Sequence, residues 1–409
     1  FEALNIYLTD NAYQPAEIHH LRLAFEEVTG EDMNWFFNQW FLDKGHPVLK
    51  VEHYYDATGK VLTLSVKQEQ DFTIVPLYRI PVFVDIYANG KVERHEIVID
   101  QSEQEFEFLI STKPDLVNFD GEKSILCERE EIKSDEEWMF QFYNAPLYLD
   151  RAWAFDHCVE MKSAEGAQVV LDAMDDAYYN IRLMAIRNIK KAQVKKHFAE
   201  ELRAKLVELA KTDSSSAVRS EAVETLQKLY GGDEELISVY TNALQDSSYM
   251  VIGSALVALA DEDPAKALDL AAQYEKEENT TVRRAVAEIY AEYGNEDQYE
   301  FFENTANSLG EGPRYSFLLL FHNYLKKQNH AIIMRGVEYY QTQALSDAPW
   351  WIRHLSVQLL LDMQNELADD QRDLESKESM LLEGGDPAEL AHVQQEIKKI
   401  EGLNEYIES

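Results

Sequence analysis

The spacing of apolar residues predicts short helices over residues 1–47. Apolar positions recur at intervals of three and four residues, as on one face of an α-helix: Ile18, Leu21, Phe25 and Val28. Pro15 and Glu17 stand where this helix should begin, and Gly30 stands where it should end. Asp32 can cap a following helix that is rich in aromatic residues. Three short helices cannot bury so many aromatic side chains against one another, so we expect them to have a further packing partner.

The pattern changes to a period of two between residues 48 and 132. Apolar and polar positions alternate in three clear runs: Leu62, Leu64 and Val66; Ile80, Val82, Val84 and Ile86; Phe106, Phe108 and Ile110. Turn-forming pairs such as Asn89-Gly90 and Asp120-Gly121 separate the runs. We therefore predict a small antiparallel β-sandwich of about seven short strands. Pro76 and Pro81 should lie at strand starts or edges, because proline cannot donate to a ladder.

From residue 133 onward the pattern is helical throughout and a short motif repeats. An apolar residue, usually followed by arginine, recurs every 31–39 residues: Ile181-Arg182, Val218-Arg219, Val251-Ile252, Val282-Arg283, Arg314 and Ile352-Arg353. Acidic turns precede several copies, as at Asp213 and Asp246. This period predicts a HEAT-like solenoid of helical hairpins, in which the aspartate caps the second helix and the arginine bridges to the next repeat. An irregular helical bundle is the alternative.

These patterns divide the chain into residues 1–47, 48–132 and 133–409. The sequence becomes more polar after Asn365, which predicts a terminal helical hairpin from about residue 365, broken at Gly384-Gly385-Asp386-Pro387. The helical pattern starts at Phe1 without a methionine or a capping residue. We therefore expect the chain to be a piece of a longer protein.

The negative charge of the chain limits the classes of partner that it can bind. Asp and Glu number 75 against 38 Lys and Arg, a formal net charge of −37. Such an excess argues against binding to nucleic acid or to an anionic membrane surface, and no apolar run is long enough for a membrane span. Cys127 and Cys158 cannot build a disulfide framework, and we expect two free thiols. The acidic pI and few cysteines fit a bacterial cytoplasm or periplasm alike.

A search for catalytic motifs assigns no catalytic or metal-binding residue. His19 and His20 are adjacent, whereas two imidazoles need a spacing of one helical turn to meet at one metal, so we expect a solvated helix face. His46 is interpreted as a turn residue, and His322, His330 and His354 lack partners at fixed spacing. His157 next to Cys158 does not make a catalytic pair, because sequence adjacency is not the required geometry. Gly59-Lys60 and Gly90-Lys91 are read as hairpin turns, and Gly253-Ser254 as a site of close helix packing.

The first 87 residues do resemble a known family. The segments Tyr13-Gln14-Pro15, Trp35-Phe36-Phe37-Asn38-Gln39-Trp40-Phe41 and Gly45-His46-Pro47 resemble the end of the catalytic domain of aminopeptidase N-type zinc metallopeptidases, the gluzincins. Gln68-Glu69-Gln70 and Ile80-Pro81-Val82 resemble strands of the small β-sandwich that follows in that family. The resemblance implies a thermolysin-like catalytic tail, a sandwich, and a HEAT-like superhelix that covers the active-site cavity.

The resemblance also implies what this segment lacks. The family binds zinc through a His-Glu-x-x-His helix and a downstream glutamate, and all its catalytic motifs precede the matching segment. The resemblance therefore predicts the C-terminal part of a zinc aminopeptidase that acts on peptides, in which this segment supplies spacer and lid, partners its own catalytic domain, and is inactive alone. The alternative is a non-catalytic solenoid that binds a protein or peptide. A carbohydrate-binding sandwich is a weaker third hypothesis.

Overall fold

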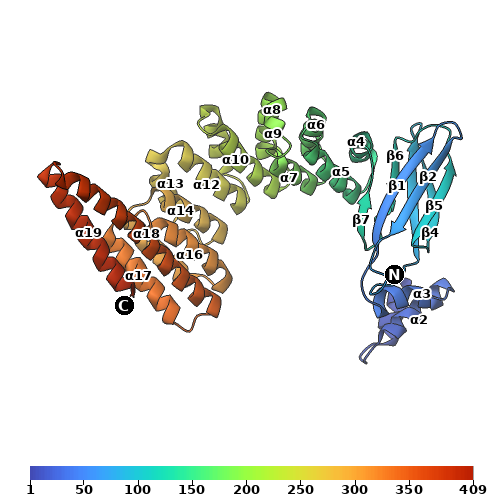
Figure 1. The fold of residues 1–409 in the computed structure, drawn as a ribbon, viewed down its shortest axis with the longest axis horizontal. Coiled ribbons are helices and arrows are strands. Elements are labelled where there is room, and N and C mark those ends of the chain that lie inside the picture. Colours follow the sequence, from blue (N-terminus) through green and yellow to red (C-terminus); the bar gives the residue numbers. More distant parts are fainter. Residues whose placement is uncertain (409) are drawn as a thin grey trace. The chain divides into compact units, whose positions relative to one another are not determined.

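The computed structural model describes residues 1–408 and divides the chain into two compact units (Figure 1). The first is Phe1–Ala199 and the second starts at Glu200. The predicted fold class is confirmed: short helices come first, a small two-sheet sandwich follows, and the rest is helical. Within residues 1–408, no helix is long and apolar enough to cross a membrane.

Four helical segments open the first unit: α1 (Glu2–Asp10), α2 (Ile18–Thr29), α3 (Asn34–Phe37) and the π-helical turn η1 (Asn38–Leu42). Glu17 caps α2 as predicted, and the Glu17 N–H donates to His20 Nδ1 at 3.0 Å. Gly30 ends α2 in the left-handed region at φ 72°. The Asp32 prediction needs a correction of one position. Met33 is the N-cap of α3, whereas Asp32 Oδ1 accepts the Asn34 N–H at 2.8 Å.

Seven strands among the described residues form the sandwich: β1 (Val48–Asp56), β2 (Val61–Gln68), β3 (Ile80–Ala88), β4 (Lys91–Ile99), β5 (Glu103–Leu109), β6 (Leu116–Phe119) and β7 (Glu128–Glu131). One sheet has the order β5-β2-β1-β7 and the other β4-β3-β6. The predicted antiparallel pairing holds everywhere except between β1 and β7, which run parallel. The alternating apolar residues of both sheets, such as Leu62 and Val84, form one buried core.

Pro81 lies at the second position of β3, as the strand-edge prediction required. Its ladder partner is Val98 on β4, and β6 pairs with β3 only at Val84–Tyr87, so no neighbour needs a hydrogen bond from Pro81 on that side. The Gly59-Lys60 and Gly90-Lys91 pairs lie in the β1–β2 and β3–β4 turns, as predicted.

A buried glutamine pair joins the helical tail to the sandwich. Gln68 Nε2 donates to the Tyr78 carbonyl at 2.7 Å, and the Tyr78 N–H donates back to Gln68 Oε1 at 2.9 Å. Gln70 Nε2 donates to Gln68 Oε1 at 3.0 Å. The Tyr78 hydroxyl reaches the Gly45 carbonyl, and its ring packs on Trp40 at 4.9 Å. The sandwich is thus a packing partner for the aromatic residues of the helical tail.

Five helices and a 3₁₀ turn complete the first unit: α4 (Asp135–Asn144), α5 (Tyr148–Met161), α6 (Ala164–Asp172), η2 (Ala173–Asp175), α7 (Tyr179–Asn188) and α8 (Val194–His197). A buried ion pair ties α5 to the sandwich, with Lys123 Nζ 2.7 Å from Asp150 Oδ1. Asn118 Nδ2 also donates to Asp150 Oδ1, at 3.0 Å. The guanidinium of Arg129 lies 4.3 Å from the centre of the Trp153 ring on α5. Polar side chains therefore specify this junction, in addition to apolar packing.

The second unit consists of helices and 3₁₀ turns: α9 (Ala199–Thr212), α10 (Ser216–Tyr230), η3 (Glu234–Leu236), α11 (Ile237–Ala243), α12 (Tyr249–Glu262), η4 (Pro264–Lys266), α13 (Ala267–Tyr274), α14 (Thr280–Tyr293), η5 (Glu296–Gln298), α15 (Tyr299–Ser308), α16 (Glu311–Leu325), α17 (His330–Leu345), α18 (Trp350–Leu382) and α19 (Pro387–Glu408). The pairs α11/α12, α13/α14, α15/α16 and α17/α18 pack as hairpins, and α10, α12, α14 and α16 pack in succession (Figure 1). This arrangement is the predicted repeat of helical hairpins.

The terminal hairpin differs from the prediction in where it begins. A single helix, α18, continues through Asn365, so the hairpin starts at Trp350 and not near residue 365. Apolar residues such as Leu359, Met363 and Leu367 remain buried on one face of α18, which keeps the helix continuous where the sequence becomes polar. The break falls at the predicted glycines, and α19 begins at Pro387.

The predicted arginine bridge is present at Arg219, whereas Arg314 and Arg353 donate to backbone carbonyls. Arg219 of α10 pairs with Asp246 in the next repeat's turn and donates Nη1 to the Asp213 carbonyl at 2.7 Å. The helix cap also differs from the prediction, since the aspartates do not cap the helices directly. Asp246 Oδ1 accepts the Ser248 N–H at 2.8 Å, and Ser248 is the N-cap residue of α12. The carboxylate therefore shapes the turn before the helix while both of its oxygens also accept hydrogen bonds from the arginine.

Candidate functional site

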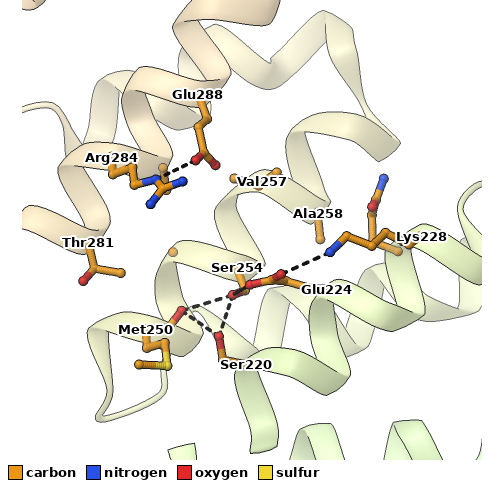
Figure 2. Close-up of a pocket in the computed structure, with 13 residues that line it drawn as sticks. Ser220, Glu224, Lys228, Met250, Ser254, Val257, Ala258, Thr281, Arg284 and Glu288 are labelled. Carbon is orange, nitrogen blue, oxygen red and sulfur yellow. Dashed lines mark hydrogen bonds and ion pairs between the residues drawn. The ribbon is translucent and has the colours of Figure 1, made fainter. Parts of the chain in front are cut away.

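A groove runs over α12 between α10 and α14 (Figure 2). Its main pocket has a volume of ≈ 390 Å³. The lining residues come from these three helices: Ser220, Glu224, Gln227 and Lys228 of α10; Met250, Gly253, Ser254, Val257 and Ala258 of α12; Thr281, Arg284, Ala285 and Glu288 of α14. All of them belong to the second unit, and charged side chains of α10 and α14 flank a floor of small residues.

Small residues on α12 create the depth of the pocket. Gly253 and Ser254 are buried, and Ala258 is almost fully buried. A Cβ atom at Gly253 would lie 3.5 Å from Thr281 Cγ2 and 3.6 Å from Ala285 Cβ, which is ordinary van der Waals contact. Packing does not require the glycine predicted at Gly253-Ser254 for close helix contact, because the space above Gly253 also admits an alanine.

Two buried hydroxyl groups form a network at the base of the pocket. Ser220 Oγ and Ser254 Oγ lie 2.7 Å apart, and Ser254 Oγ donates to Glu224 Oε1 at 2.9 Å. The Met250 carbonyl lies 3.2 Å from Ser254 Oγ (Figure 2). The residues that line the pocket include no imidazole, and the acceptor next to Ser254 is the Glu224 carboxylate. The network fixes the orientation of the Glu224 carboxylate beside the pocket.

Two ion pairs face the pocket, and the order of acid and base along the helix differs between them. On α10, Lys228 Nζ lies 3.3 Å from Glu224 Oε2. On α14, Arg284 Nε lies 2.9 Å from Glu288 Oε1. The acid precedes the base along α10, and the base precedes the acid along α14. Each pair is partly exposed, so its charges can exchange partners with a ligand at small cost.

Two further pockets adjoin the main pocket, one across α14 and one on the same side of α14, and the three together are called the groove below. One neighbouring pocket, ≈ 300 Å³, lies between α14 and α16 and is lined by Thr280, Thr281, Arg283, Arg284, Leu309, Pro313, Ser316, Phe317 and Leu320. The other, also ≈ 300 Å³, is lined by Val257, Asp261, Glu288, Ile289, Glu292 and Tyr293. Each shares two residues with the main pocket: Thr281 and Arg284 on one side, Val257 and Glu288 on the other.

Sequence reasoning missed this groove because its residues are distant in the chain. A usable signal was present, however. Ser220 and Ser254 are 34 positions apart, as are Gln227 and Asp261, whose side chains also contact each other at 2.7 Å. This separation is one repeat, so polar residues at equivalent repeat positions could have been predicted to meet.

The histidines and cysteines described below contact other side chains or lie in the core. His46 lies in the irregular segment before β1, and its Nε2 contacts Glu128 Oε1 at the start of β7 at 2.8 Å. His157 stacks on Trp138 and contacts Asp135, while the neighbouring Cys158 is fully buried. Burial raises the pKa of the Cys158 thiol to about 12, so this thiol is not the activated nucleophile of a catalytic pair. Both cysteines are free thiols, as predicted.

The described residues do not fit a zinc site. No group of three or more His, Cys, Asp or Glu side chains among residues 1–408 is arranged to hold a metal ion. We therefore derive no catalytic step through a metal on this chain.

Comparisons with known proteins agree with this architecture. A family of HEAT repeats matches residues 167–260. A search of curated proteins finds no match. Among solved structures, an aminopeptidase A of Legionella pneumophila, in complex with aspartic acid, is similar with a TM-score of 0.55 and 14% sequence identity. The similarity covers 89% of this chain and 52% of that protein, so this chain spans about half its length. The chain thus shares its fold with part of an aminopeptidase.

Proposed function

We propose that this chain is the C-terminal part of a zinc-dependent aminopeptidase that removes N-terminal residues from peptides. The observation that carries the proposal is the fold similarity to an aminopeptidase along 89% of this chain. The sequence resemblance of residues 1–87 to the aminopeptidase N type supports the same assignment independently, because it rests on the helical tail and the sandwich. The HEAT match, in contrast, falls at residues 167–260.

The exposed apolar side chains of the N-terminal helices support the proposed contact with a catalytic domain. Apolar side chains remain exposed across these short helices: Leu4, Leu8, Leu23, Val28, Phe41 and Leu42. Leu8 is 66% exposed and Leu42 54% exposed, although the sandwich already covers Trp40. Exposed apolar side chains concentrated in one short segment are typical of an interface with another protein surface. In the proposed enzyme that surface belongs to the catalytic domain.

In this proposal the chain contributes binding and enclosure, and the chemistry belongs to residues outside it. Zinc, where bound by the catalytic domain, activates water for hydrolysis of the peptide bond. The sandwich acts as a spacer, and the helical repeats restrict access to short peptides and exclude bulk water. The groove over α12 supplies a surface of suitable chemistry for contacting a peptide.

The test compares this chain with a version extended by the residues encoded upstream. We expect the extended protein to bind one zinc per chain and to release amino acids from aminoacyl-nitroanilides. We expect the 409-residue chain to do neither. Metal analysis that finds one tightly bound zinc on the 409-residue chain would contradict the proposal. An extended protein without zinc or activity that still binds peptides would favour the non-catalytic peptide-binding module.

A further inference from the structure

The charges of the two pockets that adjoin the main pocket differ in sign. At the end between α14 and α16, the described lining contains Arg283 and Arg284 and no carboxylate. At the opposite end it contains Asp261, Glu288 and Glu292 and no cation. A groove end without a carboxylate is unexpected in a chain with a net charge of −37, where acids outnumber bases two to one.

The charges at the basic end are available to a ligand. Arg283 donates Nε to the Glu277 carbonyl and Nη1 to Ser308 Oγ, and no carboxylate among the described residues pairs with it. Arg284 is 66% exposed and has the neighbouring Glu288 as its ion-pair partner. An incoming carboxylate can therefore be met by two guanidinium groups, which bind carboxylates through paired hydrogen bonds.

At the acidic end of the groove, the Asp261 carboxylate accepts hydrogen bonds from neutral side chains. Gln227 Nε2 donates to Asp261 Oδ2 at 2.7 Å, and the Tyr293 hydroxyl donates to Asp261 Oδ1 at 2.9 Å. Glu292 is partly neutralised by Lys327, at 2.6 Å. Burial and the hydrogen bond to Asp261 raise the pKa of Tyr293 to about 12, and the charge of Glu292 adds to this shift. The local potential at this end is thus negative and suits an ammonium group.

The axis of α14 reinforces this separation of charge. The helix dipole is positive at the N-terminal end, where Arg283 and Arg284 lie, and negative at the C-terminal end, where Glu292 lies. Along the helix axis Arg284 and Glu292 are ~12 Å apart, since each residue rises ~1.5 Å. An extended peptide of about four residues has this length.

We propose that the groove along α14 binds short peptides with both ends free, with the α-ammonium group at Asp261 and Glu292 and the α-carboxylate at Arg283 and Arg284. The choice of a peptide among possible zwitterions rests on the proposed function. Leu309, Phe317 and Leu320 line the carboxylate end, so the groove favours an apolar last residue. The site thereby selects peptides by length and by free termini, on helices that carry no catalytic group.

The test measures binding of Ala-Ala-Ala-Leu to the 409-residue chain by calorimetry. The free peptide is compared with its N-acetylated and its C-amidated forms. We expect each modification to weaken binding three- to tenfold, as the loss of one partly exposed charge contact should. Equal affinity for all three forms, or no binding of the free form, would overturn the inference. The aminopeptidase proposal would survive that result, because zinc binding and activity of the extended protein test it separately.

Paired variants then assign each end. Arg283→Gln with Arg284→Gln should abolish the effect of amidation and keep the effect of acetylation. Asp261→Asn with Glu292→Gln should give the reverse. Lys266→Gln, a matched control at an exposed lysine outside the groove, should change neither effect. If both pairs altered the two effects alike, the proposed orientation would be wrong.

A variant that obstructs the groove distinguishes a loss of peptide binding from a loss of folding. Val257 is half-buried where the main and acidic pockets meet, so Val257→Trp should obstruct the groove while keeping every charge. We expect this variant to retain its thermal unfolding midpoint within a few degrees and to lose binding of all three peptides. Unchanged binding by the variant would place the peptide elsewhere and overturn the inference.

Discussion

Arg219 contacts both carboxylate oxygens of Asp246, with Nε to Oδ2 and Nη2 to Oδ1 each at 2.7 Å. The two residues belong to successive repeats, so this bidentate pair joins α10 to the turn before α12. Arg219→Gln should lower the free energy of unfolding by about 1–3 kcal/mol, as expected for loss of a partly buried charged hydrogen-bond pair. Chemical denaturation measures the change, and a double-mutant cycle with Asp246→Asn isolates the pair.

The same pair predicts a dependence on pH. The hydrogen bond from Arg219 lowers the pKa of Asp246 below its ordinary value of 3.8. The stabilisation is therefore fully present above pH 3.8 and is lost as the pH falls through the lower folded-state pKa. The wild type and Arg219→Gln should differ at pH 6 and converge in acid. A difference that stayed constant down to pH 2 would argue against the ion pair as its cause.

Two helical glycines should respond oppositely to alanine. A Cβ atom at Gly166 of α6 would overlap the Cys158 carbonyl, a backbone group that cannot move aside freely. Gly166→Ala should therefore cost about 1–3 kcal/mol of stability. Gly253→Ala should be neutral or stabilising by up to about 1 kcal/mol, because its Cβ meets ordinary contacts and alanine favours the helix. Thermal unfolding of the two variants provides the comparison, and equal losses would contradict it.

His322 should make the second unit sensitive to mild acid. Its ring is 3% exposed, and neither ring nitrogen has a hydrogen-bond partner among the described residues. Burial and the charge of the nearby Lys326 lower the pKa of His322 to about 4, although Glu366 and Asp362 of α18 oppose the shift. Tyr340 of α17 packs against the ring.

The sign of this effect follows from the lowered pKa. Below pH 6.5 the His322 side chain is protonated in the unfolded chain, whereas in the folded chain it stays neutral down to about pH 4. The free energy of unfolding therefore falls across this range by on the order of 2 kcal/mol. His322→Leu should remove that part of the acid sensitivity. Unfolding curves between pH 4.5 and 7 test it: the two proteins should converge in stability towards pH 7, and parallel pH profiles would refute the prediction.

The buried pair of Lys123 and Asp150 should be costly to break on one side. Lys123→Met leaves the Asp150 carboxylate buried without its cation, so we expect a loss of about 3–5 kcal/mol. The double variant with Asp150→Leu should be less destabilised than the sum of the single changes. Fluorescence of Trp153, whose ring centre lies 5.6 Å from Lys123 Nζ, reports on unfolding at this junction. Additive losses would show that the two charges act independently.

Periodicity was sufficient to predict the regular elements. The spacing from Ile18 to Val28 predicted α2, and the alternation at Leu62 and Val84 predicted strands of the sandwich, because burial of one face imposes those periods directly. The capping predictions were off by a residue or more at Asp32 and Asp246. Both carboxylates form turn hydrogen bonds that compete with a direct cap, and sequence spacing does not separate the two.

The one-repeat spacing of Ser220 and Ser254 indicated that residues of the candidate site meet, but the sorting of its charges required the structure. Asp261 and Glu292 are two of 75 acidic residues, and their significance comes from lining one pocket together with Glu288. The sorting of charge by sign requires the three-dimensional neighbours of α14. The prediction of α18 also failed locally, because buried positions such as Met363 and Leu367 keep the helix continuous through a polar stretch.

The junction around Lys123, Arg129 and Asp150 also limits how this protein can be dissected in the laboratory. A fragment that ended after the last strand would retain Lys123 and Arg129 but lose Asp150 and the Trp153 ring that they contact. The buried charged groups of Lys123 and Arg129 would then be exposed to solvent, next to apolar surface that the removed helices had covered. Expression boundaries chosen by strand and helix alone would therefore give an isolated sandwich prone to aggregation. A boundary after Met161, which keeps α4 and α5 attached, preserves the contacts that make the sandwich complete.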